Sequence, residues 1–412
     1  MKTMFRAALT GLVLAGAAGF AAQAFPIKAG QGSYSDPGIT DDTIKIGLFA
    51  PLSGAALAYG EDPLNAARMW YDMINGMGGI WGRKVELVIE DDRCNANDLV
   101  AAVKKLVEQD KVFMLNGGSC SAAAVAAQEY VTRAKIPYMM LNASGDGALY
   151  PPTDYIFGAA SISQRAAGGT TVDFASRHLK GKKIGYINHD DAYGAWNLET
   201  AQFTAKESGA TLSVESINPN ITDVTAPMLK IRAANPDVLI LTTYARPATL
   251  IVKKAHELGM KMPIVLAVTG TANLKQLVEN VGTKDAFKNF YVQDVINDTP
   301  TGPKQKWVID MYKKRYPEMA AKPDHPTPYM PYGIPSAQTV TNALLLAGPN
   351  PTREGVARIM RSLTFESGVM AGLISYGETD RAGQESSIFL KFDGDKQDLQ
   401  PGTYVSRWVY KP

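Results

Sequence analysis

Cys120 stands between two serines in the stretch NGGSCSAAA, residues 116 to 124. Its thiol could act as a nucleophile or as a redox group, and the small hydroxyl residues around it could instead form a polar cradle for a ligand. A serine-hydrolase elbow needs G-x-S-x-G, and this stretch lacks the final glycine because that position is Ser121. Hydrolysis is therefore disfavoured, and the rest of the chain must decide between the other uses.

No other group of residues suggests catalysis or metal binding. The four histidines are scattered, without H-E-x-x-H or clustered Cys and His. The acidic runs at 90–92 and 189–191 end predicted strands, where helix caps and solvated turns are the common explanation. The glycines of NGMGGIWG follow a helix and precede a strand, the reverse of the order that a pyrophosphate loop requires. We predict no catalytic residue, no metal site and no cofactor.

The N-terminus predicts export. Residues 1–24 combine Lys2 and Arg6, an apolar run and the small residues AQA, a pattern typical of a cleaved signal peptide. Two cysteines, Cys94 and Cys120, form an even count that would most simply pair in an oxidising compartment, which weakens the free-thiol interpretation. The net charge of +2 predicts neither nucleic acid nor an anionic membrane surface as a partner.

The mature chain would have 412 − 24 = 388 residues, which favours two domains. Near-continuous apolar strands alternate with amphipathic helices, as in a parallel sheet covered on both faces. The rhythm breaks over residues 145–164 and restarts at KKIGYINHDD. We predict an α/β protein with two doubly wound parallel-sheet lobes, which would bind ligands in the crevice at the carboxyl ends of their strands.

Loops rich in hydroxyls, small residues and aromatics accompany the predicted strands. They are SGAALAYG, GGSCSAAA, LNASGD, HDDAYG, TTYARPAT and AVTGTAN. Several open directly into a helix, whose first N–H groups and positive dipole end suit a carboxylate. Ordinary helix capping would explain any single loop, but not all of them together.

These residues resemble a known family, the periplasmic solute-binding proteins of branched-chain amino acid ABC transporters, which have the type I periplasmic binding fold. The similarity extends over nearly the whole mature chain. Its most specific parts are IKIGLFAPLSGAALAYG, INGMGGIWGRKVELVIEDD, HDDAYG and AHELGMKMPIV. The resemblance implies an ABC permease of the inner membrane as partner, a periplasmic location and a monomer.

The resemblance also implies roles for particular residues. Cys94 and Cys120 match the disulfide of the family's first lobe, and Ser121 matches the serine that holds the ligand carboxylate. The other expected ligand-binding residues, including cleft candidates chosen by residue type, are Tyr59, Asn142, Ser144, Tyr193, Tyr244, Arg246 and Thr269.

Thr269 departs from the family pattern. Amino-acid binders of the family have an acidic residue there, which pairs with the ligand's ammonium group, and a buried ammonium without a counterion is costly. We therefore expect an aromatic or other hydrophobic carboxylate without an α-amine. Asp191 or Asp294 would have to replace the acid in the alternative, an amino-acid binder. An exported enzyme and a sensory partner of a membrane receptor are further alternatives.

The expected mechanism is binding without chemistry. Two lobes joined by three hinge strands, near 158–164, 292–298 and 372–378, would close on the ligand. The expected divisions are a signal peptide at 1–24, a flexible leader at 25–43, lobe 1 at 44–160 plus 297–374, and lobe 2 at 161–296 plus 375–412.

Overall fold

The computed structural model describes residues 34–54, 56–158, 161–268, 274–299, 302–322 and 325–408. The expected signal peptide, residues 1–24, lies outside the described residues, and so does Thr269. The last part of the expected leader is packed against the body of the protein, since Ile39 is buried and Arg83 donates from Nε to the carbonyl oxygen of Thr40.

The described chain divides into two units. Unit 1 contains the residues up to 161 and those from 303 to 384, and unit 2 contains 162–302 and the residues from 385 onward. The crossing after Ser161 falls in the expected segment 158–164. The other two follow Gly302 and Gln384, beyond the expected hinge strands. Residues 375–384, which we expected in lobe 2, belong to unit 1 because strand β13 pairs there with β12.

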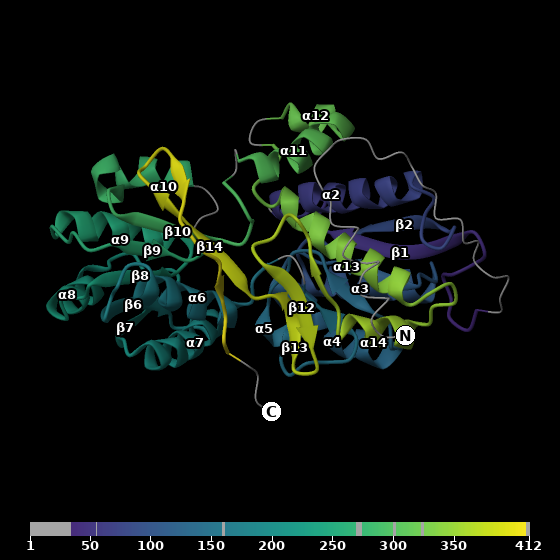
Figure 1. The fold of residues 1–412 in the computed structure, drawn as a ribbon, viewed down its shortest axis with the longest axis horizontal. Coiled ribbons are helices and arrows are strands. Elements are labelled where there is room, and N and C mark those ends of the chain that lie inside the picture. Colours follow the sequence, from purple (N-terminus) through teal and green to yellow (C-terminus); the bar gives the residue numbers. More distant parts are fainter. Residues whose placement is uncertain are drawn as a thin grey trace. The chain divides into compact units, whose positions relative to one another are not determined.

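Unit 1 is built on a parallel sheet of order β2-β1-β3-β4-β5. The order reverses between β1 and β3, as in a doubly wound sheet. Figure 1 shows α2 beside the neighbouring strands β1 and β2. The strands are β1 (Thr43–Ala50), β2 (Lys84–Asp91), β3 (Met114–Gly117), β4 (Tyr138–Met140) and β5 (Ile156–Phe157). The helices are α2 (Leu57–Gly76), α3 (Ala96–Glu108), α4 (Ser121–Ala134), α5 (Asp146–Leu149), α11 (Pro303–Arg315), α12 (Pro317–Ala320), η4 (Met330–Tyr332), α13 (Gly333–Leu346) and α14 (Arg353–Met360).

A small antiparallel sheet completes unit 1. It consists of β11 (Thr364–Glu366), β12 (Leu373–Gly377) and β13 (Asp380–Gln384). The strands β1, β3 and β4 are buried almost throughout, which is why their sequences are near-continuous apolar runs, whereas the edge strand β2 is only partly buried.

Unit 2 repeats the arrangement, with β7-β6-β8-β9-β10 in the same order along its sheet. The C-terminal strand β14, drawn in yellow in Figure 1, pairs antiparallel with β10 and makes this sheet mixed. The strands are β6 (Lys183–His189), β7 (Thr211–Ile217), β8 (Val238–Thr242), β9 (Ile264–Leu266), β10 (Phe290–Asp294), β14 (Ser386–Phe392), β15 (Gln397–Leu399) and β16 (Tyr404–Val405). The helices are α6 (Gln164–Arg177), α7 (Ala192–Ser208), α8 (Thr225–Ala233), α9 (Ala245–Glu257), α10 (Leu274–Val281) and η3 (Lys284–Phe287).

Helix α2 begins earlier than its local sequence indicates. The acids Glu61 and Asp62 and the following Pro63 are typical of the first turn of a helix, but the helix begins at Leu57 and contains Pro63 in its interior. Proline has no N–H, so it cannot donate to the carbonyl oxygen four residues earlier, which belongs to Tyr59. The first turn therefore forms with one carbonyl oxygen left for another donor.

Candidate functional site

In unit 1 the candidate site starts at the N-terminus of α4. Ser121 is the first residue of this helix, and the residue before it, Cys120, is extended and gives no side-chain cap. The sulfur of Cys120 is bonded instead to that of Cys94, so the disulfide that the sequence predicted is present. A helix start without a side-chain cap offers N–H groups and a positive dipole end to an anion.

The loop after β4 packs directly on this helix start. The Oγ of Ser121 accepts a hydrogen bond from the backbone N–H of Ser144 at 3.3 Å. The next residue must be glycine, because a Cβ on Gly145 would lie 2.7 Å from the Cβ of Ser121. Folding thus brings Ser121 and Ser144, two of the predicted residues, into contact.

A second contact joins the other two predicted residues of unit 1. The side-chain Nδ2 of Asn142 donates to the backbone oxygen of Tyr59 at 3.0 Å. This is the carbonyl oxygen that Pro63 leaves without its helical donor. The side chain of Asn142 is buried, whereas the ring of Tyr59 is 44% exposed and available to a ligand.

Sequence reasoning missed Tyr329, which joins this group. Its ring lies 4.7 Å from the ring of Tyr59, with an angle of 39° between the planes. Tyr329 belongs to the aromatic and proline-rich stretch PTPYMPYG, to which the sequence analysis assigned no role. The density of tyrosines in that stretch was the signal available.

Unit 1 also contains a buried carboxyl group near the disulfide, that of Asp92. Asp92 follows β2, and its Oδ1 accepts from the N–H of Cys94 at 2.9 Å, while its Oδ2 is buried without a hydrogen-bond partner among the described residues. Desolvation raises the pKa of Asp92 to about 6, with smaller contributions from the charges of Asp91 and Asp98. Its sequence neighbourhood suggested only a turn, and the structure gives it one hydrogen bond within that turn.

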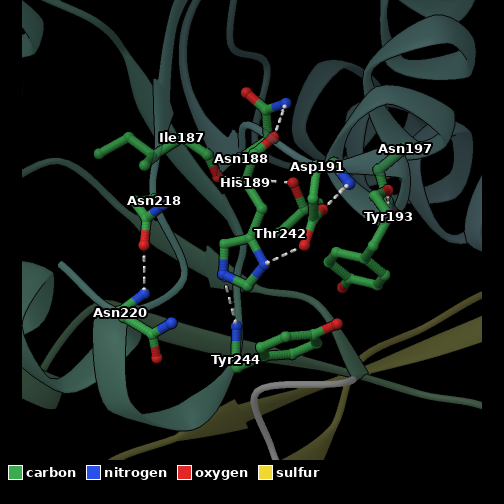
Figure 2. A network of polar contacts seen from close by, with 11 residues as sticks. Ile187, Asn188, His189, Asp191, Tyr193, Asn197, Asn218, Asn220, Thr242 and Tyr244 are labelled. Carbon is green, nitrogen blue, oxygen red and sulfur yellow. Dashed lines mark hydrogen bonds and ion pairs between the residues drawn. The ribbon is translucent and has the colours of Figure 1, made fainter.

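In unit 2 the candidate site is an aromatic and imidazole cluster at the carboxyl ends of β6 and β8 (Figure 2). The ring centroids of Tyr193 and Tyr244 are 5.1 Å apart, and they lie 5.5 and 4.4 Å from that of His189. Tyr244 is 43% exposed, whereas the side chain of His189 is fully buried. The structure therefore brings the two predicted tyrosines together around a histidine that we had not assigned to the site.

One hydrogen bond indicates the tautomer of His189. Its Nε2 accepts from the backbone N–H of Tyr244 at 3.3 Å, and its Nδ1 lies 3.8 Å from a carboxylate oxygen of Asp191 (Figure 2). The neutral ring thus carries its proton on Nδ1. Burial lowers the pKa of His189, and the charges of Asp191 and Asp190 oppose this. Asp191 also caps α7, because its Oδ1 accepts from the N–H of Gly194 at 3.0 Å.

The remaining predicted residues of unit 2 are less closely tied to this cluster. Arg246 is exposed and lines a groove with Thr249 of α9 and Gln276 of α10. Asp294, the other possible ammonium counterion, ends β10 and accepts from the N–H groups of the next two residues, at 2.7 and 3.0 Å. Desolvation raises the pKa of Asp294 to about 6.

The chain was compared with known proteins. The sequence model of the family described as periplasmic binding protein matches residues 43–397. The chain belongs to this family. A curated relative of this periplasmic binding protein is Leu/Ile/Val-binding protein homolog 7 of Brucella abortus, 26% identical over 286 residues that cover 67% of this chain and 71% of the relative.

Two solved structures share its fold. One is the branched-chain amino acid transporter substrate-binding protein LivJ from Streptococcus pneumoniae in complex with isoleucine (TM-score 0.64, 23% identity, 87% of this chain and 99% of the other). The other is a solute-binding protein of an ABC transporter from Rhodopseudomonas palustris in complex with 3,4-dihydroxybenzoic acid (TM-score 0.67, 19% identity, 90% and 99%).

Membership of the family confirms the predicted class of protein. This chain is a periplasmic binding protein and not an enzyme, and the family implies a small-molecule ligand, an ABC permease as partner and a periplasmic location. Within the described ranges no helix is long and apolar enough to cross a membrane. The same part of the chain contains no cluster of three or more His, Cys, Asp or Glu side chains placed to hold a metal ion.

Proposed function

We propose that this periplasmic binding protein captures a small carboxylate, an aromatic or other hydrophobic acid without an α-amine, and delivers it to its permease as a monomer. The observation that carries this proposal is the N-terminus of α4, where no side chain caps the helix and the hydroxyl of Ser121 stands at its first residue. Such a site suits a carboxylate, whose charge is stabilised by the helix dipole and by N–H and O–H donors.

Accessible aromatic rings support the hydrophobic part of the proposed ligand. Tyr59 in unit 1 and Tyr244 in unit 2 are exposed, and Tyr193 in unit 2 is half-buried; both tyrosines of unit 2 pack on His189. Tyrosine rings bury apolar surface with little loss of side-chain entropy and favour edge-to-face or offset contact with an aromatic ligand. The related Rhodopseudomonas palustris protein, solved with 3,4-dihydroxybenzoic acid, supports an acid of this kind.

The absence of an α-amine is proposed from the charge balance. The sequence has Thr269 where amino-acid binders of the resembling family have an acid. Asp191 is already engaged as the cap of α7 and lies beside His189. An ammonium group would therefore lack the usual counterion, at a cost of several kcal/mol if it were buried unpaired.

Asp294 favours one alternative, an amino-acid ligand such as that of the related LivJ protein. Its carboxyl ends β10 in unit 2, burial raises its pKa, and the partners recorded for it among the described residues are backbone N–H groups rather than a cation. An ammonium group placed beside it would lower that pKa and bind favourably. The alternative thus requires a carboxylate from β10 to replace the missing acid at Thr269.

A thermal-shift screen distinguishes the two classes of ligand, acids without an α-amine and amino acids. The mature protein, unfolded and refolded to remove a carried-over ligand, is tested with leucine, isoleucine and phenylalanine beside benzoate, 3,4-dihydroxybenzoate, cinnamate and phenylpyruvate. A ligand that binds only the native state stabilises it by mass action, by about 2.7 kcal/mol at a ligand concentration of one hundred times its Kd. This stabilisation appears as a higher melting temperature. Shifts with the amine-free acids alone support the proposal.

A shift with leucine that disappears in Asp294→Asn would support the alternative and contradict the proposed ligand. Calorimetric titration then measures each Kd. The monomer is checked by light scattering with and without ligand, and a ligand-linked dimer would contradict that part of the proposal.

A further inference from the structure

Asp62 lies fully buried in α2, two residues beyond the stretch SGAALAYG. Its carboxylate accepts hydrogen bonds from three donors that are remote in sequence, in residues 312–327 of unit 1. Oδ1 accepts from the hydroxyl of Tyr312 in α11, and Oδ2 accepts from Nδ1 of His325 at 2.9 Å and from the backbone N–H of Thr327 at 2.6 Å. A buried carboxylate requires partners of this kind, because an unpaired one is strongly destabilising.

The same segment is held to α2 at two further points. The hydroxyl of Thr327 donates to the backbone oxygen of Ala58 at 3.4 Å. At the other end of the segment, Gly333 approaches so closely that a Cβ there would lie 1.9 Å from the backbone oxygen of Pro63. Residues 325–333 are therefore fixed on the first two turns of α2 from both ends.

Tyr329 lies between these attachments. Its ring packs against that of Tyr59, one turn before Asp62 on the same helix. The Asp62 carboxylate holds the residues that precede Tyr329, and Gly333 holds those that follow. Tyr329 therefore belongs to a segment that is attached to α2 on both sides of it.

We propose that Asp62 is a positioning residue for ligand binding: its carboxylate holds the segment 325–329 on α2 and so sets the ring of Tyr329 against that of Tyr59. The proposal rests on the proposed function, in which Tyr59 contacts the ligand, and adds Tyr329 as a second ligand-facing ring of unit 1. Loss of the carboxylate then frees the segment and lowers affinity through Tyr329, without removing any group that touches the ligand.

The first test needs no ligand. Asp62→Asn keeps the size of the side chain but replaces one acceptor oxygen by an NH₂ group that cannot accept a hydrogen bond. Hydrogen–deuterium exchange of the peptide containing Thr327 should become at least about tenfold faster in this variant, because its amide loses a bond to a charged acceptor. The matched control is Asp310→Asn, an exposed carboxyl of α11 that pairs with Lys306. Unchanged exchange in Asp62→Asn would overturn the proposal.

The second test asks whether Asp62 acts through Tyr329. Tyr329→Leu should lower the affinity for 3,4-dihydroxybenzoate about three- to tenfold, the usual worth of an aromatic pair. Asp62→Asn should lower it by a similar factor, and the double variant should show no further loss. Losses that multiply in the double variant, or an affinity unchanged in Asp62→Asn, would contradict the proposal.

The two tests distinguish an error in the proposed function from an error in the role proposed for Asp62. If none of the acids in the screen binds the wild-type protein, the proposed function is wrong, and the exchange experiment still decides whether Asp62 holds the segment. If Asp62→Asn does not fold, His325→Leu removes one donor and keeps the carboxylate, and the same two measurements apply to it.

Discussion

The side chain of Asn142 donates a hydrogen bond to the backbone oxygen of Tyr59, the carbonyl oxygen that Pro63 leaves without its helical partner. A proline inside a helix usually costs stability, because it removes one backbone hydrogen bond and crowds the preceding turn. Here the freed acceptor ties the first turn of α2 to the loop after β4. This contact joins two residues that the sequence had assigned separately to the ligand site.

Asn142→Ala should destabilise the protein by about 1 to 3 kcal/mol, because it leaves the oxygen of Tyr59 buried without a donor. Urea denaturation measures the change. In the background of Pro63→Ala, whose new N–H can donate to that oxygen, the same substitution should cost clearly less. An equal cost in both backgrounds would show that the proline does not create the need for Asn142.

Ser121→Ala should weaken ligand binding by about 1 to 3 kcal/mol, which corresponds to roughly five- to 150-fold in Kd, because a charged carboxylate would lose one donor. Isothermal titration with the best acid of the screen gives the value. The control is Ser213→Ala, an exposed serine of β7 in unit 2, which should bind as the wild type does. Wild-type affinity in Ser121→Ala would remove the main support for a carboxylate at α4.

Asp92→Asn should stabilise the protein at pH 7.5. The folded-state pKa of Asp92 is raised to about 6, so ionisation of this buried carboxyl opposes folding above that pH, by about 1 to 3 kcal/mol. The protonated carboxyl of Asp92 contributes to the stability of the folded state below the ordinary pKa of an aspartate. This contribution is lost as the pH rises through 6. The advantage of the variant should therefore shrink toward zero near pH 4, as measured by denaturation at several pH values; a constant difference would argue against the raised pKa.

Because His189 is buried, we expect weaker ligand binding at acidic pH. Burial lowers the pKa of His189. The stability that its neutral ring provides is therefore fully present above the ordinary histidine pKa, and it is lost as the pH falls through the lower pKa of the folded state. Protonation would place a proton on Nε2, which now accepts from the N–H of Tyr244, and two donors would then face each other. We expect the Kd to rise as the pH falls below the ordinary histidine pKa, because protonation would disturb the Tyr193–Tyr244 pair.

The control for this effect is His189→Gln, whose Oε1 can accept the same hydrogen bond and does not titrate in this range. The variant should bind with little pH dependence between pH 5.5 and 7.5. A variant that follows the wild-type profile would assign the pH dependence to another group, of which Asp294 is the first to test.

Much of the architecture could be predicted from local pattern. Apolar strands that alternate with amphipathic helices indicated two α/β lobes, and each unit has its first five strands in the same doubly wound order. The pairing of Cys94 with Cys120 followed from an even cysteine count and an expected export signal. Boundaries were less accurate: α2 begins at Leu57 because a helix tolerates Pro63 where another donor serves the freed carbonyl oxygen.

The candidate site divides in the same way. The loops that contain Ser121, Tyr193 and Tyr244 could be found because each follows a buried strand and opens into a helix, a position visible in a linear pattern, and the resemblance to the family then indicated these residues. Tyr329, Asp62 and the packing of His189 on two tyrosines could not. Asp62 meets His325 and Thr327 across 263 and 265 residues of chain, and no local periodicity encodes such a pairing.

The sequence by itself determined the class of fold, the loops that carry hydroxyls and aromatics, and the family, because these depend on residue type and on spacing along the chain. The tertiary structure alone decided which of those side chains meet, which carboxyls are buried, and which distant tyrosine joins Tyr59. Those outcomes depend on desolvation and on close packing between segments remote in sequence, as at Gly145 and Ser121.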